Sequence, residues 1–368
     1  MKYVSDQRCE GLAKLCVQYS AGVKPREQVL IRGSDLALPL IDEMYKECLL
    51  SDAYPFLMPD LDVDYTFYKY AKEHQLKHVF PFHKFLYRNI DVSISVRCQA
   101  NPKRLTNIDP GRIREHSASR REIVEIFSKR AAQGELRWTL VAYPISAQAQ
   151  EAGMSLEEYE DFVYSSCLVD REDPIGEWRK IHDQQEKICD FLDRKAEMRI
   201  VGQDTDLTLN VKNRKWINSD GKKNMPSGEV FTSPLENSAD GRIRFTYPGI
   251  YAGREVEDIT LTFRRGRVTK ASAAKGAELL EEILKIKGAS RIGEVAIGTN
   301  YGITKFTKNM LFDEKIGGTI HMALGNSYQE SGGLNKSAIH WDILKDMRKD
   351  SEIYVDEELL YKDGKFLI

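Results

Sequence analysis

The chain of 368 residues lacks any apolar run near the roughly 18 residues that a membrane-spanning helix needs. Its first ten residues contain no apolar signal-peptide core. Charge of one sign is not in excess either, since 54 Lys and Arg oppose 56 Asp and Glu and leave a net charge of −2. A nucleic-acid-binding surface usually requires a basic excess or a basic patch. We therefore expect a cytoplasmic globular protein that binds neither nucleic acid nor a membrane.

Thiols and phosphate-binding loops are also scarce. All six cysteines precede residue 190, and their spacing fits neither a zinc knuckle nor a disulfide framework. They are expected to pack in the core as small apolar side chains. Neither GxGxxG nor GxxxxGK[ST] occurs, so no nucleotide cofactor is expected. The second half of the chain must therefore do any metal chemistry with carboxylates and imidazoles.

Residues 1–195 alternate between strand-like and helix-like patterns. Short apolar runs at 28–32, 93–97 and 138–142 are typical of buried strands, and helical patterns separate them. This alternation predicts an α/β N-terminal domain, in which helices cover both faces of a mostly parallel sheet. A helix predicted at 177–195 would lead out of this domain.

Residues 196–368 have a different sequence pattern, which indicates more antiparallel strands. Strand patterns at 198–201, 205–210, 242–246 and 259–263 precede one clear amphipathic helix at 275–287. We predict an α+β C-terminal domain here, and the candidate metal site lies within it.

Four apolar segments of the second half each contain ionisable side chains. These residues are Glu229, Glu294, His321 and the pair His340 and Asp342. An unpaired carboxylate in an apolar interior costs many kcal/mol, so buried charges are normally paired or bound to a metal. The second half has only two histidines, and both belong to this set.

The final segment has the most specific spacing. Strand side chains alternate between faces, so Ile339, Trp341 and Ile343 are expected on one face and His340 and Asp342 on the other. A nitrogen ligand beside an oxygen ligand suits a borderline divalent metal.

The charges of the set allow two kinds of metal centre. Three carboxylates and two neutral imidazoles give −3, which a bound hydroxide would bring into balance with two divalent cations at +4. That count fits a dinuclear hydrolase. Without the two glutamates, two histidines and one aspartate form a mononuclear iron site. The residues alone leave both possibilities open.

The motifs around these residues resemble those of a known enzyme family. They are MPSGEVFTSP at 225–234, GEVAI at 293–297, LFDEK at 311–315, HMALG at 321–325 and SAIHWD at 337–342. In these segments the chain resembles the metalloaminopeptidases of family M29. The likeness extends along the whole chain but is specific only from about residue 204 onward.

The resemblance implies a two-metal centre with Zn, Co or Mn bound by Glu229, Glu294, His321, His340 and Asp342. Glu294 matches the carboxylate that bridges both metals, and a bridging water or hydroxide would be the nucleophile.

Tyr328 matches a tyrosine that follows the first histidine by seven residues, and it would donate a hydrogen bond to the oxyanion. The resemblance further implies peptide substrates with a free N-terminus. It also implies an N-terminal domain that walls the cavity and contributes contacts to a homodimer.

Two other functions compete with this interpretation. Dihydroxypyridine dioxygenases are similar in layout, and a mononuclear Fe(II) ring-cleaving enzyme could use His321, His340 and Asp342 unchanged. Such a site does not need Glu229 and Glu294. The other alternative is a non-catalytic protein that binds a metal or a peptide.

Overall fold

The computed structural model describes residues 6–368, which form two compact units. The first extends to Ile175 and also includes Gly221–Pro226, and the second comprises Gly176–Asp220 and Ser227–Ile368. The boundary expected after residue 195 thus falls before most of helix α10 (Pro174–Leu192). The reason is packing, because Ile188 and Leu192 of this helix lie in the core of the second unit.

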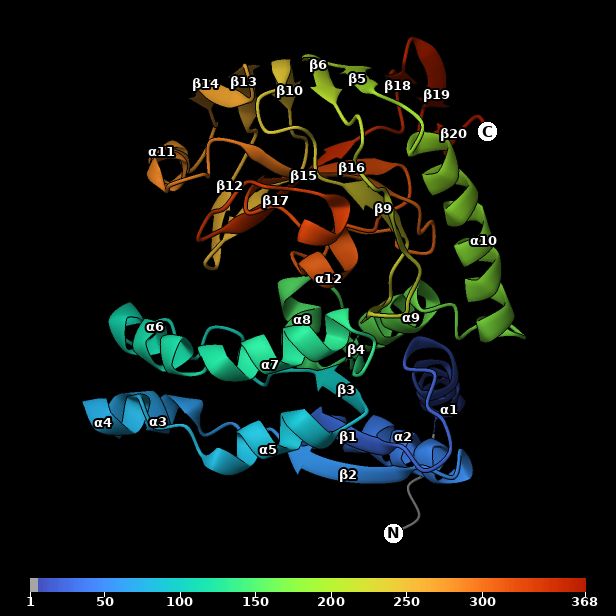
Figure 1. Cartoon of the computed structure of the whole chain (residues 1–368), viewed down its shortest axis with the longest axis vertical. Helices are drawn as coiled ribbons and strands as arrows, with labels where there is room; N and C mark the ends of the chain where they lie inside the picture. The colour runs from blue at the N-terminus through green and yellow to red at the C-terminus, as the bar shows by residue number, and fades with distance from the viewer. Residues whose placement is uncertain (1–5) are drawn as a thin grey trace. The chain divides into compact units, whose positions relative to one another are not determined.

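The first unit contains one parallel sheet of five strands, in the order β2-β1-β3-β4-β8. Figure 1 shows β1 to β4 side by side. The strands are β1 (Gln28–Gly33), β2 (Tyr54–Pro59), β3 (Val92–Arg97), β4 (Arg137–Ala142) and β8 (Asn224–Met225). The prediction of a parallel α/β region is confirmed. We call this sheet the N-terminal sheet.

Helices cover both faces of the N-terminal sheet. Gly33 of β1 faces α2 (Leu38–Leu50), and a Cβ at this glycine would lie 2.9 Å from the Ile41 side chain. Leu30 points to the opposite face, where it packs with α5 (Pro81–Asn89) and α7 (Arg121–Ala132).

The other helices of this unit are α1 (Gln7–Lys14), which continues as a π-helix over Leu15–Ser20, α3 (Asp64–Tyr70), α4 (Glu73–Leu76), α6 (Pro110–Ser119), α8 (Ser146–Glu151), α9 (Leu156–Ser166) and a 3-10 turn at Asp35–Ala37. Over residues 6–368, none of the helices combines the length and the apolar character that crossing a membrane requires.

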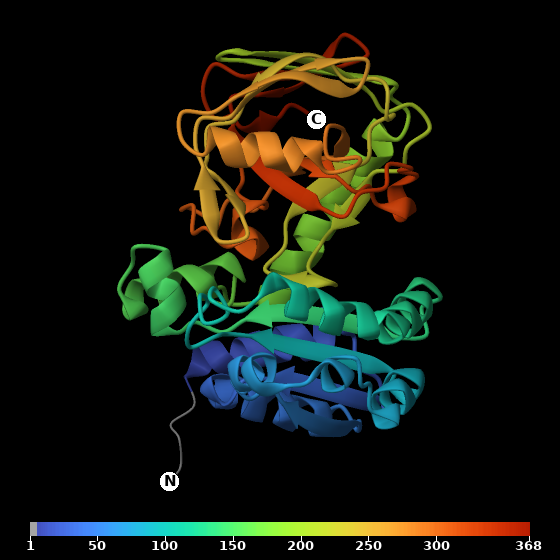
Figure 2. The same cartoon turned by 90° about the vertical axis from the view of Figure 1, so that its left-hand side faces the viewer.

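The second unit contains two antiparallel sheets that share one apolar core, and Figure 2 shows them as separate layers. The larger sheet has the order β14-β13-β10-β6-β5-β18-β19-β20. Its strands are β5 (Glu197–Gly202), β6 (Thr205–Asn210), β10 (Asp240–Arg244), β13 (Thr260–Arg264), β14 (Arg267–Ser272), β18 (Glu352–Val355), β19 (Glu358–Lys362) and β20 (Lys365–Phe366). The prediction of a region rich in antiparallel strands is confirmed.

The second sheet of this unit has the order β17-β16-β15-β9-β7, and we call it the site sheet. Its strands are β7 (Ile217–Ser219), β9 (Glu229–Thr232), β15 (Ile292–Gly298), β16 (Thr319–Gly325) and β17 (His340–Asp346). The remaining elements are the hairpin β11 (Gly249–Tyr251) and β12 (Arg254–Val256), α11 (Ala277–Lys285), α12 (Met310–Asp313) and a 3-10 turn at Gln329–Ser331.

Candidate metal centre

The register of the site sheet places all five predicted ligands on one face. Ala323 lies opposite both Glu294 and Asp342, Ala296 lies opposite His321, Gly325 lies opposite His340, and Gly298 lies opposite Glu229. Directly paired residues of antiparallel strands project to the same side, as do residues two apart on one strand. Four strands that come from distant parts of the sequence therefore bring the five side chains together. The opposite face packs into the core of the unit through Trp341 and Ile343, as the alternation predicted.

Small residues pair with the ligands across the sheet. Alanine or glycine pairs with each of the five, although on their other sides His321 pairs with Leu344 and Glu229 pairs with Ser219. At Gly293 the register shifts in a bulge just before Glu294. A Cβ at Gly293 would lie 2.4 Å from the carbonyl oxygen of Asn326, so only glycine permits this close approach.

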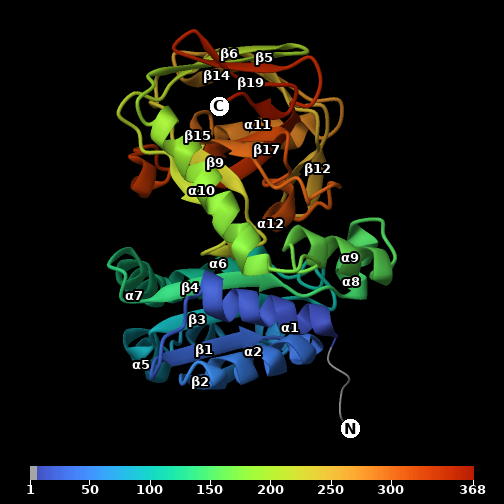
Figure 3. The ribbon, with the colours of Figure 1, turned by 90° about the vertical axis from the view of Figure 1, so that its right-hand side faces the viewer.

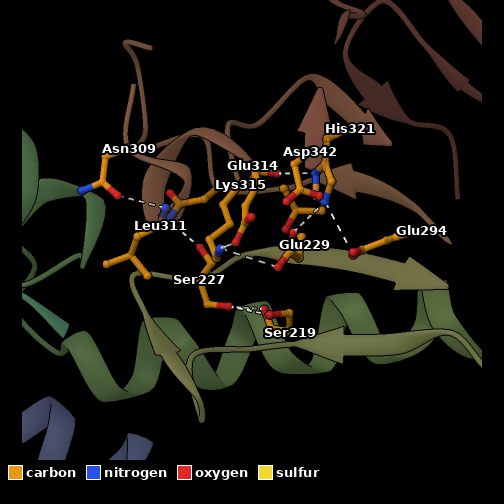
Figure 4. Close-up of polar contacts among 12 residues, drawn as sticks. Ser219, Ser227, Glu229, Glu294, Asn309, Leu311, Glu314, Lys315, His321 and Asp342 are labelled. Atoms are coloured by element: carbon orange, nitrogen blue, oxygen red, sulfur yellow. Dashed lines mark hydrogen bonds and ion pairs between the residues drawn. The ribbon is translucent and has the colours of Figure 1, made fainter. Parts of the chain in front are cut away.

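Close contacts connect the five side chains through the two imidazoles. His321 Nε2 lies 3.6 Å from Glu229 Oε2 and 3.6 Å from Glu294 Oε1. His340 Nε2 lies 2.9 Å from Glu294 Oε2 and 3.4 Å from Asp342 Oδ1. Glu294 thus contacts both histidines, and Figure 4 shows its contact with His321.

The backbone fixes the orientation of both imidazoles. His321 Nδ1 lies 2.9 Å from the carbonyl oxygen of Glu314, and His340 Nδ1 lies 2.8 Å from that of Asn326. A carbonyl can only accept, so each Nδ1 carries a hydrogen and donates. Each Nε2 is therefore directed at the carboxylates, which is the usual arrangement of a metal-binding histidine.

The donor set fits a divalent metal. Glu229 Oε2 and Asp342 Oδ1 are buried and accept no hydrogen bond within residues 6–368, which is a costly state for a carboxylate oxygen unless a cation completes the site. Two groups of three residues could each hold a metal, because the ligand atoms within each group lie no more than 4.8 Å apart. One group is Glu294, His340 and Asp342, and the other is Glu314, His321 and Asp342. Asp342 belongs to both groups.

The electrostatics of the site favour bound positive charge. Burial alone would lower the pKa of His321, but Glu294 and Glu229 raise it to about 10. The pKa of His340 is likewise raised to about 11, against the effect of burial, by Asp342 and Glu294. At neutral pH both imidazoles of the metal-free protein are therefore protonated on both nitrogens. Their positive charge takes the place of the charge that a metal would supply.

Two charged residues of the site were not identified from the sequence. Glu314 and Lys315 follow the short helix α12, and the Lys315 side chain is fully buried beside the carboxylates of Glu314 and Glu229. The sequence signal was present, because both residues belong to the LFDEK motif. Charged residues in a short helix and turn are usually solvated, so the pattern alone did not mark them.

Tyr328 lies at the more open side of the site. Its ring centroid is 5.0 Å from that of His340 and 5.3 Å from that of Phe231, and the residue remains 40% exposed. Burial of the hydroxyl and the nearby carboxylates, Glu294 first among them, raise the pKa of Tyr328 well above its ordinary value. The hydroxyl therefore keeps its proton at neutral pH and can act as a donor.

Comparison with known proteins identifies related enzymes along most of the chain. Aminopeptidase 2 of Geobacillus stearothermophilus is 25% identical over 98% of this chain and 95% of its own length. Aminopeptidase AmpS of Bacillus subtilis is 29% identical over 73% of this chain and 74% of its own length.

Solved structures share the fold. Wild-type AmpT of Thermus thermophilus superposes with a TM-score of 0.84 at 21% identity, covering 98% of this chain and 99% of that one. A 2,5-dihydroxypyridine dioxygenase of Pseudomonas putida KT2440 superposes less closely, with a TM-score of 0.59 at 14% identity, covering 98% and 96%. The family model described as thermophilic metalloprotease (M29) matches residues 5–366. Since this match spans nearly the whole sequence, the chain belongs to the M29 metalloprotease family.

Proposed function

We propose that this metalloaminopeptidase releases the N-terminal residue of peptides at a dinuclear centre held by Glu229, Glu294, His321, His340 and Asp342. The observation that carries the proposal is the pair of ligand groups that share Asp342. Glu314 completes the second group and is added to the ligand set. The relatives named above, which are aminopeptidases, support the reaction class.

Divalent metals such as Zn, Co or Mn, when bound here, would lower the pKa of a shared water and polarise the scissile carbonyl. The protein provides the geometry for this chemistry. Two carboxylates could reach both metals: Asp342, which belongs to both ligand groups, and Glu294, which contacts both imidazoles. The carbonyls of Glu314 and Asn326 hold the imidazoles so that each Nε2 stays aimed at the site.

Tyr328 is proposed to donate its hydroxyl proton in a hydrogen bond to the oxyanion of the tetrahedral intermediate. Support comes from its place against the ring of His340, at the more exposed end of the ligand set. A peptide that approaches from this side would meet Tyr328 before the buried His321.

The test combines metal content with substrate choice. Protein purified without added metal is examined by elemental analysis, and turnover is compared between Leu-p-nitroanilide and N-acetyl-Leu-p-nitroanilide. We expect two divalent metals per chain and cleavage of only the free-amine substrate. Equal cleavage of the blocked substrate would refute the aminopeptidase function, and a single metal would refute the dinuclear centre.

The dioxygenase alternative retains one supporting observation, the shared fold at a TM-score of 0.59. Against it stand Glu229 and Glu294, which contact His321 and occupy places that a mononuclear iron site does not require. Oxygen consumption with 2,5-dihydroxypyridine and Fe²⁺ separates the two functions, and we expect none.

We also propose that the protein is a cytoplasmic homodimer. The edge strand β2 of the N-terminal sheet exposes Tyr54, Phe56 and Leu57, which supports burial of this edge against a second copy. Light scattering of the wild type and of Phe56→Lys tests the dimer, which the substitution should weaken.

The cysteines support the cytoplasmic location. All six are buried free thiols, which supports a reducing compartment.

A further inference from the structure

Lys315 is one of two lysines whose side chains are fully buried in the second unit, and the two have opposite surroundings. Lys315 Nζ contacts Glu314 Oε1 and lies 3.7 Å from Glu229 Oε1. Lys345 Nζ instead donates to the backbone carbonyls of Gln203 and Arg244, each at 3.3 Å. An ammonium beside one buried and one partly buried carboxylate is part of a charge cluster, whereas an ammonium that contacts only carbonyls is a solitary ion.

The segment that carries Lys315 is held in place independently of the cluster. Asp313 Oδ1 accepts hydrogen bonds from both the backbone N–H and the hydroxyl of Thr307, at 2.7 and 2.9 Å. The backbone N–H of Lys315 donates to Phe312, and its carbonyl accepts from Asn300. Figure 4 shows the side chain reaching from this turn to the acidic residues. This hydrogen-bonded turn thus holds the ammonium of Lys315 beside the ligand set.

The net charge of the site depends on this ammonium. Four carboxylates, those of Glu229, Glu294, Glu314 and Asp342, give −4, and Lys315 reduces the total to −3. Two divalent cations would then leave the loaded site at +1, whereas the same site without Lys315 would be neutral. An excess of positive charge disfavours a further cation and favours an anionic nucleophile or oxyanion.

We propose that Lys315 is a built-in counter-cation of the metal centre, which weakens metal binding and in exchange keeps the loaded site net positive for catalysis. The inference rests on the proposed function, since it concerns the same ligands. Lys315 acts through Glu229 and Glu314 and is therefore a positioning residue.

The experiment compares Lys315→Met, Lys315→Arg and Lys345→Met in the full-length protein. Zinc affinity is measured by competition with a chelating dye, and kcat is measured at saturating metal. For Lys315→Met we expect at least about tenfold tighter zinc binding, which is the effect of removing one nearby unit charge, together with at least about tenfold lower kcat. Lys315→Arg keeps the charge, so its zinc affinity should stay within about threefold of the wild type.

Lys345→Met is the matched control for losing a buried ammonium. We expect unchanged zinc affinity and equal losses of melting temperature with and without metal. Lys315→Met should lower the melting temperature of the metal-free protein more than Lys345→Met does, because it leaves buried carboxylates without their cation. With metal bound, much of that loss should be recovered.

Unchanged or weaker zinc binding in Lys315→Met would overturn the inference, as would tighter binding in Lys315→Arg. If the wild type binds no divalent metal, the proposed function fails and this inference fails with it. If the wild type binds metal but the two methionine variants lose the same melting temperature without metal, the counter-cation role alone is rejected.

Discussion

Both five-stranded sheets of this protein have buried central strands, but these strands carry different kinds of side chain. Strand β1 of the N-terminal sheet buries Val29, Leu30 and Ile31 on both faces, as a parallel sheet between helices requires. Strands β15 and β16 of the site sheet are also buried throughout, yet one of their faces carries Glu294 and His321. Burial on both faces is thus a structural property in the first sheet. In the site sheet, burial keeps the charged groups away from water, and charges interact more strongly in such surroundings than they do in water.

Metal removal should have the largest effect of all these changes, and it should act on the site sheet and not on the N-terminal sheet. Treatment with 1,10-phenanthroline is expected to abolish activity, and Co²⁺, Zn²⁺ or Mn²⁺ should restore it. Loss of the metals should also lower the melting temperature, because a ligand at 100 times its Kd stabilises the folded state by about 2.7 kcal/mol. The non-chelating isomer 1,7-phenanthroline is the control. Activity that survives chelation would contradict a metal mechanism.

Substitution of one buried side chain in each sheet gives the next largest effect. Glu294→Gln should lower kcat at least about 1000-fold, or about 4 kcal/mol in the barrier, since Glu294 contacts both imidazoles. Thr139→Val changes an equally buried residue of β4 and should leave kcat within about twofold. Near-normal turnover in Glu294→Gln, with an intact circular dichroism spectrum, would remove this residue from the site.

Tyr328→Phe tests the open side of the site sheet. Loss of one oxyanion donor is expected to reduce kcat about 100-fold, with little change in KM. The control is Tyr301→Phe, in which an exposed tyrosine of the same unit loses its hydrogen bond to the carbonyl of Gly364. If the two variants have the same kcat, the hydroxyl of Tyr328 has no part in turnover.

The smallest effect concerns the support behind strand β9. Gln185 of α10 donates to the carbonyls of Ser219 and Glu229 and to the side chain of Asn218, and Figure 3 shows α10 alongside the strands of this unit. Gln185→Met should cost about 2 kcal/mol of unfolding free energy and lower kcat only a few-fold. Ser93→Ala in the N-terminal sheet should cost less and leave kcat unchanged. Denaturant titration measures both, and an inactive but stable Gln185→Met would show that Gln185 has a more direct role.

The sequence predicted the features that depend on strand alternation. The pattern around His340 and Asp342 indicated which face would carry the ligands, because one period of two residues governs both burial and chemistry. The register that joins Glu229 to Glu294 could not be read locally, since it depends on pairing between strands about 60 residues apart.

Two elements escaped prediction for identifiable physical reasons. Strand β2 contains Pro55 and Pro59, which argue against a strand, but an edge strand tolerates them because one side of it needs no partner. Glu314 and Lys315 lie in a turn, where charge normally means contact with solvent. Only the tertiary fold buries them.

Main-chain carbonyls, not side chains, set the imidazole orientation in this site. The spacing from Glu314 to His321 is 7 residues, and that from Asn326 to His340 is 14. Neighbouring side chains can therefore vary during evolution without turning either ring. An insertion or deletion in one of these two intervals would displace the carbonyl that a ring depends on, so we expect changes in the lengths of the two connections to be tolerated less well than substitutions within them.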